Sequence, residues 1–186
     1  MTAVAGSQPR LTITNRCLGD RVTFLQRTDG QGSPTVIEIE LLPSGGNAAH
    51  VHRSFDEHFT CLSGTLGLEV GGRKLYLKSG EQATARSGVP HRFFNPGTEL
   101  VSFRVELRPG HAGFERGLIV AYGLANDGLT TQGGVPRNPL HLAVLCEIGE
   151  AGLPGPMGLL QPLLNLLAAR ARRLGVDREL IARYGA

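Results

Sequence analysis

Short apolar–polar segments and turn-forming residues alternate along the first 110 residues of the chain. Three segments, residues 21–28, 35–42 and 99–107, have apolar side chains at roughly every second position. Steps such as Ser63-Gly64 and Gly71-Gly72 separate further short runs, and such steps are typical of tight turns. Many short strands at this spacing predict a mainly β fold of the sandwich or barrel type.

The pattern changes after Pro109-Gly110, where apolar residues recur at helical spacing. We predict helices over residues 113–126, from about 139 onward, and over 159–175, with a short last segment at 177–185. A linker rich in proline and glycine, residues 152–158, precedes the third helix.

The chain is therefore expected to have two parts. Residues 1–110 are predicted to form a β-barrel that begins with a loose terminus, residues 1–10. Residues 111–186 are predicted to form an α-helical extension that packs on the barrel or on a partner subunit.

Composition agrees with a turn-rich protein and excludes some functions. The 186 residues include 26 glycines and 11 prolines, and the formal net charge is only +3. No basic stripe interleaved with aromatic residues precedes the arginines near the C-terminus, so we expect no nucleic-acid partner. Three scattered cysteines without a CxxC pair fit a reducing compartment. No secretory leader or apolar run of about 20 residues is evident, so we expect a cytoplasmic protein without membrane contact.

Histidine and acidic residues crowd into the sequence NAAHVHRSFDEHF. His50 and His52 are two residues apart, so on an extended chain their side chains face the same side. Glu57 can return through a turn, and on the next strand it shares a face with Cys61 while His58 points outward. Two imidazoles and one carboxylate suit iron, manganese, nickel, copper or zinc.

A second segment, GEQATARSGVPHRFFN, makes this pattern more specific. The two segments together resemble the two motifs of the cupin superfamily. The first motif, Gly-x5-His-x-His-x3–4-Glu-x6-Gly, is matched by His50, His52, Glu57 and Gly64. The second, Gly-x5-Pro-x-Gly-x2-His-x3-Asn, is matched by Gly80, Gly88, His91 and Asn95. Ser44 and Arg86 depart from the motifs at turn positions.

The resemblance implies a double-stranded β-helix, a jelly-roll-like barrel, whose motif-bearing core spans about residues 38–107. It also implies one divalent transition metal, Fe, Mn, Ni, Cu or Zn, with four ligands: His50, His52, Glu57 and His91. The alternative is that these four are hydrogen-bonded polar residues of a barrel that binds a ligand without a metal.

The reaction does not follow from the ligand set. The resemblance to quercetinase-like enzymes favours a metal-dependent dioxygenase, in which Glu57 is a metal ligand or a catalytic base. The same ligands also serve isomerases and polyketide cyclases, and a barrel that only binds a small ligand is a further alternative. The expected partner is a small molecule, and because cupin barrels commonly pair through edge strands, the resemblance implies a homodimer.

Other residues have simpler interpretations. We expect Cys61 to be a small core residue and Glu106 to face solvent. His111 and His141 are expected to be solvated or helix-terminal. The leucines between residues 159 and 167 cover more than one stripe of their helix. We expect them to pack on the barrel or on a second subunit, and contact with a membrane surface is the alternative.

Overall fold

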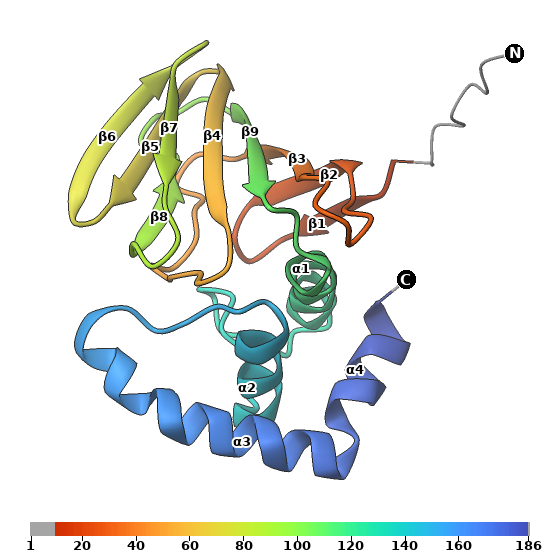
Figure 1. Cartoon of the computed structure of the whole chain (residues 1–186). Helices are drawn as coiled ribbons and strands as arrows, with labels where there is room; N and C mark the ends of the chain where they lie inside the picture. The colour runs from red at the N-terminus through yellow and green to blue at the C-terminus, as the bar shows by residue number, and fades with distance from the viewer. Residues whose placement is uncertain (1–9, 186) are drawn as a thin grey trace, which may run out of the picture.

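The computed structural model describes residues 10–185, so residues 1–9 of the predicted loose terminus lie outside the described part. Strands come first along this part of the chain and helices follow (Figure 1). The strands are β1 (Thr12–Asn15), β2 (Asp20–Gln26), β3 (Thr35–Leu41), β4 (Asp56–Ser63), β5 (Thr65–Val70), β6 (Arg73–Lys78), β7 (Gln82–Ala85), β8 (His91–Phe94) and β9 (Val101–Arg108). The helices are α1 (Ala112–Asn126), α2 (Pro139–Ile148), the 3-10 helix η1 (Gly155–Leu160), α3 (Gln161–Leu174) and α4 (Val176–Tyr184).

The strands form two antiparallel sheets that enclose the main core. The larger sheet has the order β1-β2-β3-β9-β4-β7, and the smaller one has the order β6-β5-β8. β9 thus lies between β3 and β4, although four strands separate it from β4 along the chain. The chain passes repeatedly between the two sheets, as in a double-stranded β-helix, and the predicted mainly β fold with a helical extension is confirmed (Figure 1).

The inner face of the larger sheet carries the apolar residues that the alternating pattern selects. β3 and β9 bury every second residue, and Ile37 lies opposite Val105 while Ile39 lies opposite Phe103. Burial of each such side chain contributes about 1.5–3 kcal/mol. Glu106 lies on the other face of β9, as predicted, and forms an ion pair with Arg108.

Helix α1 joins the barrel to the other helices. His111 caps its N-terminus, because the Phe114 N–H donates a hydrogen bond to His111 Nδ1 at 2.9 Å, which confirms the helix-terminal interpretation. One side of α1 contributes Ile119 and Tyr122 to the barrel core. The other side contributes Val120 to a second core, shared with α2, α3 and α4. The helices below the barrel therefore rest on it through α1 (Figure 1).

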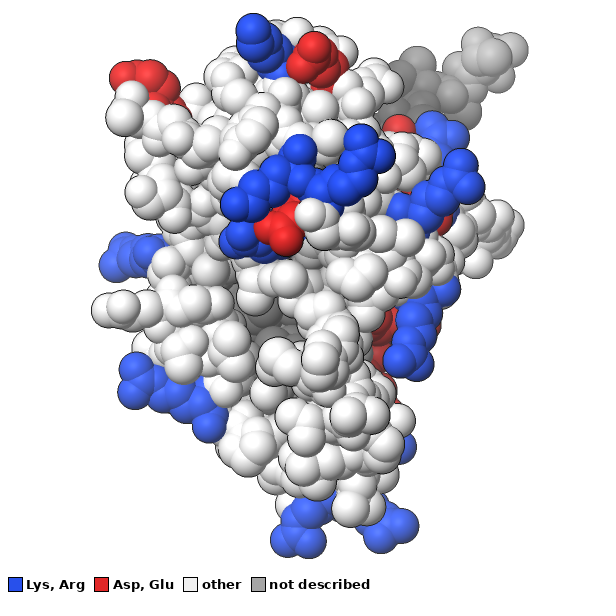
Figure 2. Space-filling view, turned by 90° about the vertical axis from the view of Figure 1, so that its left-hand side faces the viewer, with Lys and Arg blue, Asp and Glu red and all other residues white. Residues whose placement is uncertain are grey.

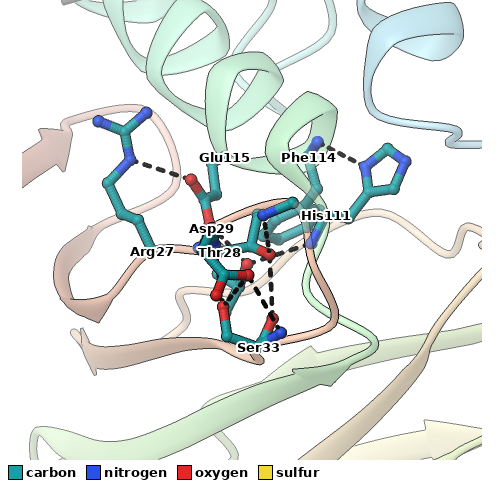
Figure 3. A network of polar contacts seen from close by, with 9 residues as sticks. Arg27, Thr28, Asp29, Ser33, His111, Phe114 and Glu115 are labelled. Atoms are coloured by element: carbon teal, nitrogen blue, oxygen red, sulfur yellow. Dashed lines mark hydrogen bonds and ion pairs between the residues drawn. The ribbon is translucent and has the colours of Figure 1, made fainter.

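A buried carboxylate fixes α1 to the connection between β2 and β3 (Figure 3). Glu115 is 1% exposed and accepts hydrogen bonds from Arg27 Nε at 2.9 Å, the Thr28 N–H at 2.7 Å and Thr35 Oγ1 at 2.6 Å. Thr35 Oγ1 also accepts a bond from the His111 N–H at 3.2 Å. The carboxylate is paired and hydrogen-bonded, as a buried charge must be. The first turn of α1 is thereby held against the barrel.

Helix α3 lies on the side of α2 that faces away from the barrel (Figure 1). It packs mainly on α2 through Leu164, Ala168 and Ala171. Leu159 is 84% exposed and Leu166 is 67% exposed, so these leucines do not pack on the barrel. The predicted linker, residues 152–158, is only partly irregular because η1 begins within it.

Figure 2 shows the side of the molecule on which η1 and the start of α3 lie, and the helical part of this face has few charged side chains. Among residues 10–185, no helix combines the length and the apolar character that a membrane crossing requires.

Candidate metal centre

The two histidines of the first motif lie on an extended segment before β4, not on a regular strand. His50 pairs with His91 of β8, and the N–H of each donates to the carbonyl of the other, at 3.0 and 2.9 Å. The His52 carbonyl accepts a hydrogen bond from the Gly88 N–H at 2.7 Å. The chain then bends and returns as β4, on which Glu57 points inward. Backbone hydrogen bonds thus hold the two motifs side by side.

Four side chains meet at the centre of this arrangement. Each of the residues His50, His52, Glu57 and His91 offers one ligand atom, and these atoms lie within 4.8 Å of one another. Glu57 Oε1 lies 3.2 Å from His52 Nε2, and Glu57 Oε2 lies 3.6 Å from His91 Nε2. Backbone carbonyl oxygens lie 2.9 Å from Nδ1 of His50 and of His91, which orients these rings. The structure therefore brings together all four residues that the sequence analysis selected.

The chemistry of the cluster fits a divalent cation. Nε2 of His52 and Nε2 of His91 are buried and lie near the Glu57 oxygens, but among the described residues they form no hydrogen bond of good geometry, which is costly unless another group meets them. Burial alone would raise the pKa of Glu57, but pairing with His52 and His91 outweighs it and holds that pKa below its usual range. Burial, together with the charge of His52, lowers the pKa of His50 to about 4. Burial alone would lower the pKa of His91, but pairing with Glu57 outweighs it and raises that pKa. Metals bind an ionised carboxylate and neutral imidazoles, so a metal ion could take the place of a proton in this cluster.

Two neighbours of the cluster in sequence have other roles. The buried Cys61 thiol lies 3.7 Å from the carbonyl oxygens of Ser63 and Gly64, which agrees with the core position predicted for it. His58 lies on the outer face of β4, as predicted, with Nδ1 2.9 Å from Thr84 Oγ1. Neither side chain belongs to the four-residue cluster.

A cavity of about 290 Å³ adjoins the cluster. His50, His52 and Glu57 line part of its wall, and most of the remaining wall is apolar. Side chains of both the barrel and the helices contribute to the apolar wall, among them Val22, Ile37, Ile39, Phe93, Val105 and Phe114. A mainly apolar cavity with a few convergent polar groups is typical of a small-molecule site.

The contribution of the helical extension to this cavity was not predicted from the sequence. Phe114, Leu118 and Tyr122 of α1 line the cavity, and so does Asp20 at the start of β2. Asp20 could have been noticed, because it occupies the first inward position of an alternation that continues with Val22. A polar residue at an inward position is a departure that calls for an explanation.

Comparisons with known proteins agree with this fold and site. Residues 37–111 match the family model described as the cupin domain. The crystal structure of an RmlC-like cupin from Shewanella frigidimarina NCIMB 400 matches with a TM-score of 0.50 and 15% sequence identity, over 57% of this chain and 89% of that chain. Residues 37–111 are thus similar in sequence to the cupin domain, and the fold is that of a cupin.

Two further similar proteins have named activities. Quercetin 2,3-dioxygenase of Bacillus subtilis (strain 168) is 32% identical over 101 residues, which are 52% of this chain. The match spans only 30% of the dioxygenase, less than a third of its length. The polyketide cyclase RemF from Streptomyces resistomycificus is 24% identical, with a TM-score of 0.47, over 58% of this chain and 80% of that chain. The likeness to the cyclase concerns the fold alone.

Proposed function

We propose that this protein is a metal-dependent dioxygenase that acts on a small, mainly apolar substrate. One observation carries the proposal: three histidines and a glutamate converge at the wall of an apolar cavity. The similarity to a quercetin dioxygenase over about half of the chain supports the reaction class.

Each residue of the cluster has a role in this proposal. His50, His52 and His91 would hold the ion through ring nitrogens, and Glu57 through a carboxylate oxygen. A bound transition metal would supply Lewis acidity and, if it is redox-active, chemistry with dioxygen. Glu57 is alternatively the candidate catalytic base. Its depressed pKa keeps the carboxylate ionised but makes it a weak base, so a bound metal would have to acidify the substrate hydroxyl that gives up its proton. The apolar cavity wall excludes water from this proton transfer.

Oxygen uptake tests the proposal. The protein is loaded anaerobically with Fe(II), Mn(II), Ni(II), Cu(II) or Zn(II), and then mixed with oxygen and with quercetin, simpler aromatic diols or dicarbonyl compounds. We expect uptake that requires the metal and is lost in His52→Ala. His58→Ala is the matched control and keeps the activity, because His58 lies on the outer face of β4.

Two results would contradict a dioxygenase. Metal binding without oxygen uptake on any of these substrates would leave a binding protein. Conversion of a substrate without consumption of oxygen would indicate an isomerase or a cyclase.

A further inference from the structure

The cavity contains a second buried carboxylate that belongs to neither cupin motif. Asp20 is 7% exposed and points inward on the same face of β2 as Val22. The Tyr122 hydroxyl of α1, on a side chain that is 4% exposed, donates a hydrogen bond to Asp20 Oδ2 at 2.6 Å. Both residues line the cavity that His50 and Glu57 also line. The pair is therefore placed to meet whatever molecule the cavity holds.

The other oxygen of this carboxylate is unpaired. Asp20 Oδ1 is buried and has no hydrogen-bond partner within residues 10–185. The buried Glu115 is different, because its oxygens accept hydrogen bonds from Arg27, Thr28 and Thr35. Burial raises the pKa of Asp20 to about 6, which reflects the cost of keeping this carboxylate away from water. An unpaired acceptor in a cavity wall is explained if a ligand supplies the missing donor.

The sheet register places this pair far from the metal-ligand cluster. Asp20 lies opposite Leu41, and Leu41 lies opposite Val101, whereas Glu57 lies opposite Leu107. Val101 and Leu107 are six residues apart on β9, since 107 − 101 = 6. This separation corresponds to about 20 Å along the strand. The two polar groups thus lie toward opposite ends of the larger sheet.

We propose that Asp20 and Tyr122 form a substrate anchor that accepts a hydrogen bond from a hydroxyl or N–H group. The tyrosine proton is already donated to Asp20, so the positions that remain free on the pair are acceptors. The anchor selects a ligand with a donor at one end, an apolar middle and a metal-binding oxygen at the other end. An elongated hydroxylated compound with several aromatic rings has this chemistry. The metal-binding end of this ligand rests on the proposed function, whereas the donor end does not.

Matched pairs of aromatic compounds test the anchor. The members of a pair carry a hydroxyl or a methoxy group at the same position, and quercetin and its methyl ethers are included. Affinities are measured under nitrogen by thermal stabilisation and by titration. We expect the wild-type protein to bind the hydroxyl member at least about tenfold more tightly in one or more pairs. In Asp20→Asn, the amide oxygen keeps the hydrogen bond from Tyr122, and the amide NH2 group, a donor, takes the place of the free acceptor Oδ1. The preference for the hydroxyl member is then lost or reversed.

Further variants separate the anchor from general effects. The Tyr184 hydroxyl also donates to an aspartate, Asp127 Oδ2, at 2.6 Å, but this pair is exposed. Asp127→Asn is therefore a matched control that keeps the preference. Tyr122→Phe leaves the Asp20 carboxylate in place, so we expect this variant to keep the preference for the hydroxyl member. Loss of the preference in Asp20→Asn but not in Tyr122→Phe assigns it to the carboxylate.

The outcomes distinguish the two proposals. A hydroxyl preference that persists in Asp20→Asn overturns the anchor, and so does the absence of any preference in the wild-type protein. If only the proposed function fails, metal-dependent oxygen uptake is missing while the Asp20-dependent preference remains.

Discussion

Replacement of Glu115 tests how the helical extension is joined to the barrel and how the cavity keeps its helical wall. Glu115→Ala removes a carboxylate that is 1% exposed and accepts hydrogen bonds from three groups. Arg27, one of the donors, is 46% exposed and can turn toward water. Thr35, another donor, is fully buried and has no access to water.

The structure sets the size of the expected effect. Glu115→Ala leaves the Thr28 N–H and the Thr35 hydroxyl without their acceptor, and each buried unsatisfied donor costs about 1–3 kcal/mol, so we expect a loss of about 2–5 kcal/mol of unfolding free energy. Glu115→Gln should cost only about 1–2 kcal/mol. Its carbonyl oxygen can keep the bonds from Thr28 and Thr35, because both donate to the same oxygen, Oε1. Only the charge-assisted hydrogen bond from Arg27 is lost, and water can solvate the Arg27 guanidinium in its place.

Denaturant unfolding at pH 7 measures these differences. Glu40→Gln is the matched control, because it breaks an exposed ion pair with Arg21 and should leave the unfolding free energy nearly unchanged. Equal costs for Glu115→Ala and Glu115→Gln would refute the reasoning. A cost below about 1 kcal/mol for Glu115→Ala would refute it as well.

Three further predictions concern the pH dependence of stability, helix packing and assembly. The pKa of Asp20 is raised from 3.8 to about 6, so the folded state binds a proton more tightly and loses stability as the pH rises from about 4 to about 6. Asp20→Asn removes this loss, so denaturation should show that its unfolding free energy exceeds that of the wild type by about 3 kcal/mol at pH 7.5 and by little at pH 3.5. Equal effects at the two pH values would contradict the raised pKa of Asp20. Gly113→Ala should lower the melting temperature, because the new methyl group would overlap the Ile148 carbonyl oxygen. Gly117→Ala should not, because a methyl group there makes ordinary contacts. Similar melting temperatures for the two variants would refute this. Light scattering should give the mass of the homodimer that the cupin resemblance implies, and a single-chain mass would contradict it.

The strands and the cluster of His50, His52, Glu57 and His91 could be predicted because both depend on local regularities. In β3 and β9, side-chain direction follows from an alternation of period two, so inward residues such as Ile37 and Phe103 are recognisable from the sequence. The cluster could be predicted from the sequence because both motifs keep fixed spacings. Its two halves meet through backbone pairing between His50 and His91.

Contacts between distant parts of the chain could not be predicted. The hydrogen bond between Asp20 and Tyr122 joins residues 102 positions apart, and no periodicity indicates that α1 lies over the barrel. The orientation of α3 was also undetermined, because its leucines cover more than one stripe. In the structure, the small side chains of Ala168 and Ala171 face α2, so the larger exposed leucines lie on the other side.

The central claim is that His50, His52, Glu57 and His91 bind one metal ion. The most direct test is the metal content of the purified, tag-free protein, measured by plasma mass spectrometry beside a His91→Ala variant whose fold is checked by circular dichroism. We predict about one transition-metal ion per chain in the wild-type protein and none in the folded variant. A wild-type protein that is purified without metal and also refuses Fe(II) and Mn(II) under anaerobic conditions would contradict the claim.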